Sequence, residues 1–450
     1  MSLVPGLPAP GRAAVRAGVV GNFVDQINIF LPVVALAPAL ATLAGPHTGV
    51  TAGAVVIVAT LLGRPIGAMI FGRIADRIGR TRTTKIAIAG TAVCSLAIAS
   101  VPGHQHIGVW AITAVIALRF VGGAFLAGEY TSAIPLAMEW SAPRRRGLVS
   151  GLIMSMAAWA QSAIAFATIG LIALLGIGAY ADYGWRFAFA AGGIASLLLL
   201  AYYSKQVADA PQVTAERAVA DRARTGARAG LRAVLIGQYA GAFWQVFALM
   251  SGLWLMTNMV VIAVTGRLET DLSLDSDNVA LMMGVASIAQ AVVMAITGHL
   301  SSRLGRRRFF IGWGLLAAVA GPLFWTLTLT TEAIPAIYGI ALLQIVTVCG
   351  YGPVGAYLSE RFEAHVRSTG YGTAYSLSIV LPALWPWWLP ILEGILGRNE
   401  SVVTVLAVAG LLVAGCGALG PRLSPDDLDR DVEAVARIPR RDREPMSVQS

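Results

Sequence analysis

Three ionisable residues lie inside long apolar stretches of this 450-residue chain, namely Asp25, Arg119 and Glu129. A charge at the centre of a bilayer costs about 3 kcal/mol on the insertion scale, so residues of this kind are candidates for function. A buried carboxyl group can carry a proton, and a guanidinium can bind a carboxylate through two hydrogen bonds. We therefore predict proton carriers at Asp25 and Glu129, and an anionic-substrate contact at Arg119.

The alternative is a permanent ion pair between Arg119 and one of the two carboxylates. On the helix expected around Asp25, Asn22 and Gln26 share one face with it, which predicts a wet cavity beside that face. Further candidate substrate contacts are Asn28, Gln161, Gln245 and Tyr375. For single polar residues of this kind, a hydrogen bond between neighbouring helices is the competing interpretation.

Composition indicates the elements that position these residues. The chain is 56% hydrophobic and 13% charged, whereas soluble domains carry about a quarter charged residues. Unbroken apolar runs of about 20 residues predict membrane-spanning helices rather than the shorter alternating segments of a β-barrel. We predict an all-α polytopic membrane protein with twelve transmembrane helices. The spans are expected at 17–43, 51–72, 84–102, 108–139, 148–176, 185–203, 234–265, 278–300, 309–330, 335–358, 368–392 and 401–420.

The net charge of +9 is distributed unevenly. Most Lys and Arg residues fall in the N-terminus, in alternate loops and in the C-terminal tail, while the opposite loops hold Arg267 and Arg398. This positive-inside asymmetry predicts that both termini are cytoplasmic. It also indicates that the basic residues orient the chain in a lipid bilayer and do not bind nucleic acid. The Arg-rich, Lys-poor, Ala- and Gly-rich composition predicts a bacterial plasma membrane.

A loop repeats between the two halves of the chain. Residues 72–82 (GRIADRIGRTR) recur at 298–308 as GHLSSRLGRRR. Glu139 precedes Arg146 by the same spacing that separates Glu360 from Arg367. Such parallel repeats predict two six-helix halves. The boundaries are an N-terminal bundle at 1–203, a cytoplasmic loop at 204–233, a C-terminal bundle at 234–420 and a cytoplasmic polar tail at 421–450.

The repeated loop is similar to the signature of the major facilitator superfamily, and three other segments resemble its metabolite:proton symporters. They are 64–68 (RPIGA), 358–362 (LSERF) and 366–370 (VRSTG). The resemblance implies alternating access and proton-coupled uptake of a small polar metabolite, either a mono- or dicarboxylate or a zwitterion. It implies that a proton gradient, without a cofactor, drives transport and that the protein functions as a monomer.

The resemblance also implies a cytoplasmic latch that holds one conformation and breaks in another. An alternative is that its arginines only enforce topology, although the glycines carry no charge and Asp76 has the opposite sign. The second copy has Ser302 in place of Asp76, which predicts an asymmetric latch. The latch candidates are Arg64, Gly72, Asp76, Arg77, Gly79, Arg80, Glu139, Arg146, Arg303, Gly305, Arg306, Glu360 and Arg367.

Differences from the symporter pattern, and motifs that the sequence lacks, limit the functions that are possible. Asp25 and Asn28 stand where the symporter pattern has Glu and Asp, so the substrate stays open. The chain has no Gly-Lys pair, which excludes a Walker A loop for ATP. Its cysteines show no metal-binding spacing, and no His-Glu-x-x-His motif indicates an enzyme. The absence of proline in 148–176 favours uptake, and a proton-driven exporter of small molecules is the alternative.

Overall fold

A computed structural model describes residues 7–45, 49–209, 231–330 and 334–422. The described chain is helical throughout, without strands. The interior of the predicted inter-bundle loop and nearly all of the predicted tail lie outside these ranges. The N-terminal helical segments are α1 (Ala9–Val34), η1 (Ala37–Ala39), α2 (Leu40–Ala44), α3 (Gly49–Ile78), α4 (Arg80–Ala99), α5 (His104–Ile107), α6 (Trp110–Trp140), η2 (Pro143–Arg145), α7 (Arg146–Leu175), α8 (Ile177–Ala179), η3 (Tyr180–Gly184) and α9 (Trp185–Gln206).

The second set of helices begins at residue 231. Its members are α11 (Leu231–Leu235), α12 (Ala240–Thr257), η4 (Asn258–Ala263), α13 (Val264–Thr270), α14 (Ser276–Leu304), α15 (Arg306–Leu329), α16 (Ala336–Val348), η5 (Cys349–Tyr351), α17 (Val354–Glu360), α18 (Arg367–Leu377), α19 (Val380–Ala383), α20 (Trp385–Leu396) and α21 (Arg398–Leu419).

Within the described residues, ten helical segments are long and apolar enough to cross a membrane. The pair 367–383 and 385–396, bent by 48°, makes an eleventh span. The helix α4 is less apolar because Arg80, Arg82 and Lys85 lie in its first turns. It nevertheless packs between α6 and α9, and its 20 residues rise about 30 Å, the thickness of the hydrocarbon core. The all-α polytopic fold is therefore confirmed, with a helix for each predicted span.

One predicted span differs clearly from the structure. The apolar run 17–43 predicts a single helix, but α1 begins at Ala9 and ends at Val34, and the short segments η1 and α2 follow. Pro38 stands inside η1. Because proline lacks an amide hydrogen and clashes with the preceding turn, a continuous helix through this point is disfavoured.

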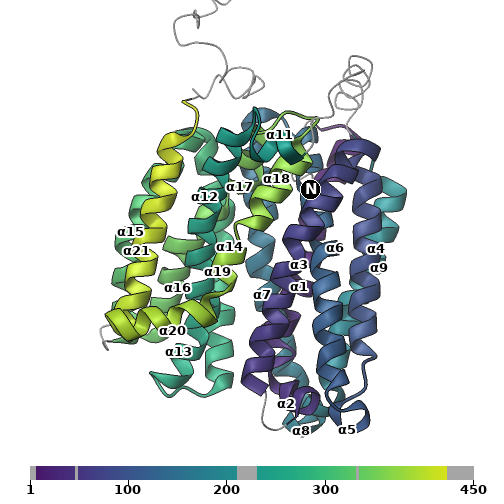
Figure 1. The fold of residues 1–450 in the computed structure, drawn as a ribbon, viewed down its shortest axis with the longest axis vertical. Helices are drawn as coiled ribbons and strands as arrows, with labels where there is room; N and C mark the ends of the chain where they lie inside the picture. The colour runs from purple at the N-terminus through teal and green to yellow at the C-terminus, as the bar shows by residue number, and fades with distance from the viewer. Residues whose placement is uncertain (1–6, 46–48, 210–230, 331–333, 423–450) are drawn as a thin grey trace, which may run out of the picture.

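Figure 1 shows the helices as two groups standing side by side. We call α1 to α9 the N-terminal bundle and α12 to α21 the C-terminal bundle. The helix α7 packs along α14, and α3 packs along α18. Glycines bring the first pair together backbone to backbone: a Cβ atom on Gly298 would lie 2.5 Å from the carbonyl oxygen of Gly147. Small residues of this kind allow close helix contact in membranes.

The glycines of the repeated loop have two different roles. Gly79 and Gly305 have φ values of 99° and 85°, and each joins two helices through a single residue. Only glycine adopts this left-handed region without strain. Gly72 instead permits a close approach, since a Cβ atom there would lie 2.9 Å from the Cα of Thr369 on α18. We call the end of the molecule that carries Gly79 and Gly305 the Arg-rich face.

Candidate functional site

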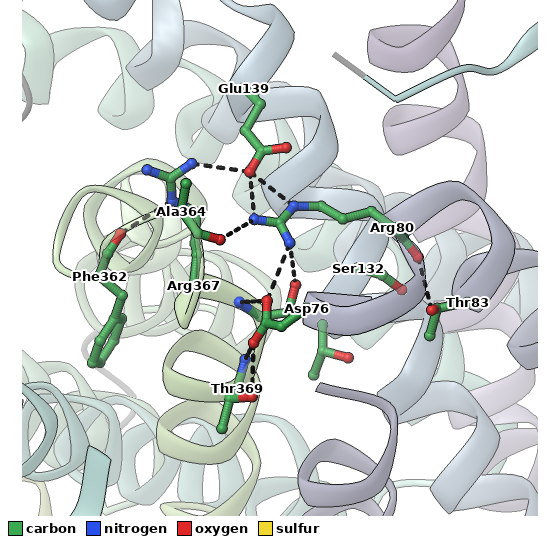
Figure 2. A network of polar contacts seen from close by, with 12 residues as sticks. Asp76, Arg80, Thr83, Ser132, Glu139, Phe362, Ala364, Arg367 and Thr369 are labelled. Carbon is green, nitrogen blue, oxygen red and sulfur yellow. Dashed lines mark hydrogen bonds and ion pairs between the residues drawn. The ribbon is translucent and has the colours of Figure 1, made fainter. Parts of the chain in front are cut away.

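A buried ion cluster lies at the Arg-rich face of the N-terminal bundle. Arg80 begins α4 directly after Gly79, and its side chain is 1% exposed. Its Nε donates to Oε1 of Glu139 at 2.8 Å, and its Nη1 lies 3.3 Å from Oδ1 of Asp76. Figure 2 shows the guanidinium held between these two carboxylates. The helices α3, α4 and α6 thus each contribute one charged side chain to this buried cluster, in which the guanidinium is paired with carboxylates.

The same cluster reaches across to the C-terminal bundle. Arg80 donates to the Ser368 hydroxyl at 2.8 Å and to the Ala364 carbonyl oxygen at 3.1 Å. Asp76 accepts hydrogen bonds from the backbone amides of Ser368 and Thr369, at 3.1 and 2.9 Å, and from the Thr369 hydroxyl. These amides form the first turn of α18, where a helix favours a negative charge. The two bundles are therefore tied together at this face.

Glu139 is shared between the bundles. Its Oε1 accepts from Arg80 of the N-terminal bundle and from Arg367 of the C-terminal bundle, the latter at 2.9 Å. The sequence pattern groups Glu139 with Arg146 of its own half, whose Nε donates to the Met138 carbonyl oxygen. In this conformation Glu139 therefore contacts the arginine of the opposite repeat.

The second copy of the loop makes a different set of bonds. Arg306 binds Glu360 through two hydrogen bonds, of 3.1 and 3.0 Å. It also donates to the hydroxyls of Ser301 and Ser302. All four residues belong to the C-terminal bundle. The bonds of Arg306 thus differ from those of Arg80, which reach the opposite bundle.

Three arginines of the predicted latch lie apart from it. Arg77 and Arg303 are exposed at the Arg-rich face. The residue Arg64 lies half way along α3, about 20 Å from the end of this helix beside Gly79 at 1.5 Å per residue. It is 2% exposed. The prediction that Arg64 belongs to the loop network is therefore corrected by its position, because its side chain lies in the interior between the bundles.

Aromatic rings surround the Arg64 guanidinium. Its central carbon lies 5.7, 5.6 and 5.5 Å from the ring centres of Tyr130, Trp254 and Tyr375. These three residues, here called the aromatic cage, come from α6, α12 and α18 and so from both bundles. Cation–π attraction operates at such distances. The Arg64 Nε has no hydrogen-bond partner among the described residues.

Two carboxyl groups lie beside this layer. Asp25 on α1 and Glu129 on α6 are each 2% exposed and lie close enough to interact with each other. Two carboxyl groups this close favour a proton on one of them. Gly21 makes room for the contact, since a Cβ atom there would lie 3.1 Å from Oε1 of Glu129. Arg64 is close enough to attract the Asp25 carboxylate. We call Asp25 and Glu129 the carboxyl pair.

Arg119 makes no ion pair in the part of the chain that the structure describes. Its Nε donates to the Thr60 hydroxyl at 3.0 Å, and its Nη2 lies 3.4 Å from the Ile29 carbonyl oxygen. Both partners belong to the N-terminal bundle. The alternative of a permanent ion pair with Asp25 or Glu129 is thus not seen in this conformation.

The amides on α1 point to different neighbours. Asn22 donates to the carbonyl oxygen of Ile153 on α7 at 2.5 Å. Asn28 donates to the Ser196 hydroxyl at 3.2 Å, and Gln26 is buried. Asn28 therefore bonds inside the N-terminal bundle, whereas Asn22 points toward α7, which packs on the C-terminal bundle.

The remaining candidates separate into two groups. Tyr375 belongs to the aromatic cage. Gln245 donates to the Tyr357 hydroxyl at 2.9 Å and to the Cys416 carbonyl oxygen at 2.7 Å, so its amide bonds helices of the C-terminal bundle to each other. Gln161 is buried on α7. The sequence reading missed Tyr130 and Trp254; the signal for Tyr130 was its place directly after a buried acid, Glu129.

These features define a class of protein. Two bundles enclose a buried charged layer, and an ion network joins them at the Arg-rich face, which is the construction of an alternating-access membrane transporter. The described residues contain no group of His, Cys, Asp or Glu that could hold a metal ion. The sequence profile of the Major Facilitator Superfamily matches residues 19–386. The chain belongs to this superfamily; it is a membrane transporter and not an enzyme.

Several characterised transporters are similar in sequence. The proline/betaine transporter of Escherichia coli (strain K12) is 25% identical over 417 residues, covering 89% of this chain and 82% of the relative. The alpha-ketoglutarate permease of the same strain is 25% identical over 368 residues, covering 81% and 82%. Its shikimate transporter is 25% identical over 365 residues, covering 79% and 81%.

Solved structures share the fold. The proton:xylose symporter XylE bound to 6-bromo-6-deoxy-D-glucose superposes with a TM-score of 0.78 at 16% identity, covering 95% of this chain and 99% of that one. The human organic anion transporter MFSD10 gives a TM-score of 0.69 at 14% identity, covering 91% and 100%. At these identities the likeness concerns the fold alone.

Proposed function

We propose that this protein is a proton-coupled symporter that takes up a small metabolite bearing a carboxylate, either an organic anion or a zwitterion. The observation that carries the proposal is Arg64, a buried guanidinium with an unpartnered Nε that contacts both bundles. The membrane is a bacterial inner membrane, and the Arg-rich face and both termini are cytoplasmic. That orientation rests on the positive-inside charge distribution.

The chemistry of this layer suits a carboxylate. A guanidinium pairs with a carboxylate through two parallel hydrogen bonds, and in the bilayer interior it gains more from such a partner than it would in water. The aromatic cage would then face the remainder of the substrate, and ring faces attract ammonium and quaternary ammonium groups. Proline, betaine, alpha-ketoglutarate and shikimate, named for three of the relatives, all contain a carboxylate.

The carboxyl pair supplies the proton site in this proposal. Arg64 is the cation that attracts the Asp25 carboxylate while it has no other partner. A substrate carboxylate that binds Arg64 weakens this attraction, and a proton on the pair then becomes more favourable. Substrate and proton therefore load together. Arg119 stays in the proposal as a second cation for dicarboxylates, and Asn22 and Gln26 as polar contacts on α1.

Transport in proteoliposomes tests the proposal. With an imposed proton gradient, we expect accumulation of labelled proline, betaine, 2-oxoglutarate or shikimate together with proton entry, reported by a trapped pH dye. If none of these substrates causes proton entry, proton-coupled uptake is contradicted. Substrate-stimulated proton movement that accompanies only efflux would favour the exporter.

Matched variants assign the residues. Arg64→Gln is expected to lower uptake at least about 100-fold, since a bidentate charged contact contributes about 3 kcal/mol. Arg119→Gln is the control and should retain uptake of monocarboxylates. The reverse pattern would move the carboxylate site to Arg119. Asp25→Asn with Glu129→Gln should retain exchange of labelled for unlabelled substrate and lose accumulation; accumulation in this double variant would exclude the pair as proton carrier.

A further inference from the structure

A basic pocket of about 460 Å³ lies between α1 and α9, away from the transport layer. Two arginines of α1 and the only lysine of α9 line it, namely Arg12, Arg16 and Lys205. Tyr202 and Gln206 add a hydroxyl and an amide, and the other lining residues are alanines. No carboxylate is among the lining residues. The pocket therefore gathers three cations around a space that a single anion can occupy.

The pocket opens on the outer surface of the N-terminal bundle. Its three cations are exposed, and α9 lies at the outer side of this bundle in Figure 1. The pocket lies at the Arg-rich end of both helices, because α1 begins there and α9 ends there. It therefore stands at the level where membrane-spanning helices leave the hydrocarbon core, the level of lipid headgroups.

An apolar surface continues from the pocket toward the middle of the membrane. On α1, Arg12, Arg16 and Val20 follow one another at four-residue spacing and share a face. On α9, Leu198 lies two turns below Lys205. Val20 and Leu198 are 52% and 68% exposed. An exposed apolar side chain on each helix thus lies below the cationic pocket, where the acyl chains of a lipid whose phosphate occupies the pocket would lie.

We propose that this pocket, formed by Arg12, Arg16, Lys205 and Tyr202, binds the phosphate of an anionic phospholipid. Three cations attract a phosphate. The exposed apolar side chains below the pocket favour a phosphate that carries acyl chains over a soluble phosphate. Basic residues close to a bilayer surface attract anionic lipids, and pockets between transmembrane helices bind their headgroups. The site is independent of the transported substrate.

Lipid binding to the purified full-length protein tests the proposal. Native mass spectrometry and thermal unfolding would be followed in neutral detergent micelles while phosphatidylglycerol or phosphatidylcholine is added. We expect bound phosphatidylglycerol and a raised Tm, and no comparable response to phosphatidylcholine. Each cation at a bilayer surface changes anionic-lipid affinity about fivefold, so Arg16→Gln with Lys205→Gln should weaken phosphatidylglycerol binding about 30-fold.

The matched control is Arg73→Gln with Arg308→Gln, which removes two exposed charges from the same face outside the pocket. This control should bind phosphatidylglycerol within twofold of the original chain, and the charge-preserving Arg16→Lys with Lys205→Arg should restore most of the affinity. Equal loss in the pocket and control variants would overturn the proposal. Glycerol 3-phosphate that competes as strongly as the lipid would show a soluble-anion site and would also overturn it.

Discussion

The two copies of the repeated loop have the same arginine and use it differently. Arg80 of the first copy bonds residues of both bundles, including Ser368 of the C-terminal bundle. Arg306 of the second copy bonds Glu360, Ser301 and Ser302, all within its own bundle. Both arginines are buried. The repeat therefore preserves a buried, compensated arginine; the first copy bonds the other bundle directly, whereas in the second half Glu360 attracts Arg146 of the N-terminal bundle.

Close backbone packing accompanies charge in the second copy. Gly147 stands opposite Ser302, and a Cβ atom on Gly147 would lie 2.1 Å from the Ser302 hydroxyl oxygen and 2.4 Å from the Gly298 carbonyl oxygen. At the first copy, polar bonds between the bundles hold the Arg-rich face closed. At the second copy, the close steric fit of the two backbones contributes to this closure. A repeated sequence motif can therefore close one face of a transporter both through polar bonds and through backbone packing.

Toward the opposite face, no ion pair joins the bundles among the described residues, although Ser162 on α7 donates to the Gly284 carbonyl oxygen on α14 at 2.6 Å. The ion pairs of that face join Arg267, Asp271, Glu393 and Arg398, which all belong to the C-terminal bundle. Between α3 and α19, Leu61 makes an apolar contact with Ile379 and Ala383. Closure of this conformation by charge is therefore concentrated at the Arg-rich face, where changes to the loops should have their largest effect.

The largest effect is expected from Glu139→Gln. This change removes the shared partner of Arg80 and Arg367 and leaves two poorly compensated charges, which costs about 3–5 kcal/mol for buried pairs. The closed Arg-rich face should therefore lose most of its population. Electron spin resonance distances between labels at Arg73→Cys and Arg308→Cys would measure this opening, in a background where the buried Cys94, Cys349 and Cys416 are replaced.

Glu360→Gln is the matched control, because Glu360 occupies the equivalent position in the other half. It should lower Tm through the loss of its bonds to Arg306 while changing the distance distribution much less than Glu139→Gln. Equal opening in the two variants would show that the halves contribute alike and would remove the asymmetry inferred from the bonding pattern.

Part of this comparison was predictable from the sequence. The aspartate of the first copy and the serine of the second indicated an asymmetric latch, and the apolar runs indicated the helices. The partners across the bundles were not predictable, because Asp76 accepts from the backbone amides of Ser368 and Thr369, which every residue type provides. Backbone donors leave no signal in residue identity.

The position of Arg64 was not predictable from the sequence for another reason. Its motif lies near the repeated loop along the chain, yet a helix rises about 1.5 Å per residue, so a short separation already moves a side chain into the interior. The aromatic cage takes Tyr130, Trp254 and Tyr375 from three helices in two bundles. Only the packing of the bundles brings such distant residues together, and single-sequence patterns do not contain it.

A smaller effect is expected from Gly298→Ala, which tests the steric half of the comparison. The added Cβ would lie 2.5 Å from the Gly147 carbonyl oxygen, a backbone atom that cannot turn aside. Overpacking of this kind costs about 1–3 kcal/mol. We expect a partial opening in the same distance measurement and slower uptake.

Gly312→Ala serves as the control for this change. Gly312 lies in α15, and a Cβ atom there would meet nothing within 4 Å. Alanine should therefore be neutral or slightly stabilising, because it favours the helix by up to about 1 kcal/mol. An unchanged distance distribution in Gly298→Ala would mean that the glycine contact does not hold the bundles together.

The smallest effect, and the one that most directly sharpens the comparison, is expected from Ser302→Asp, which gives the second copy the acid of the first. The new carboxylate would stand four residues before Arg306 and opposite Gly147, in the first turn of α7. An anion at a helix N-terminus contributes about 0.3–1 kcal/mol, so the closed Arg-rich face should gain up to about fivefold in population and transport should slow accordingly. Ser302→Asn, of similar shape without the charge, should leave both measurements near their original values. If the two variants behave alike, charge at this position does not control closure, and the asymmetry between the copies then depends on the glycine packing alone.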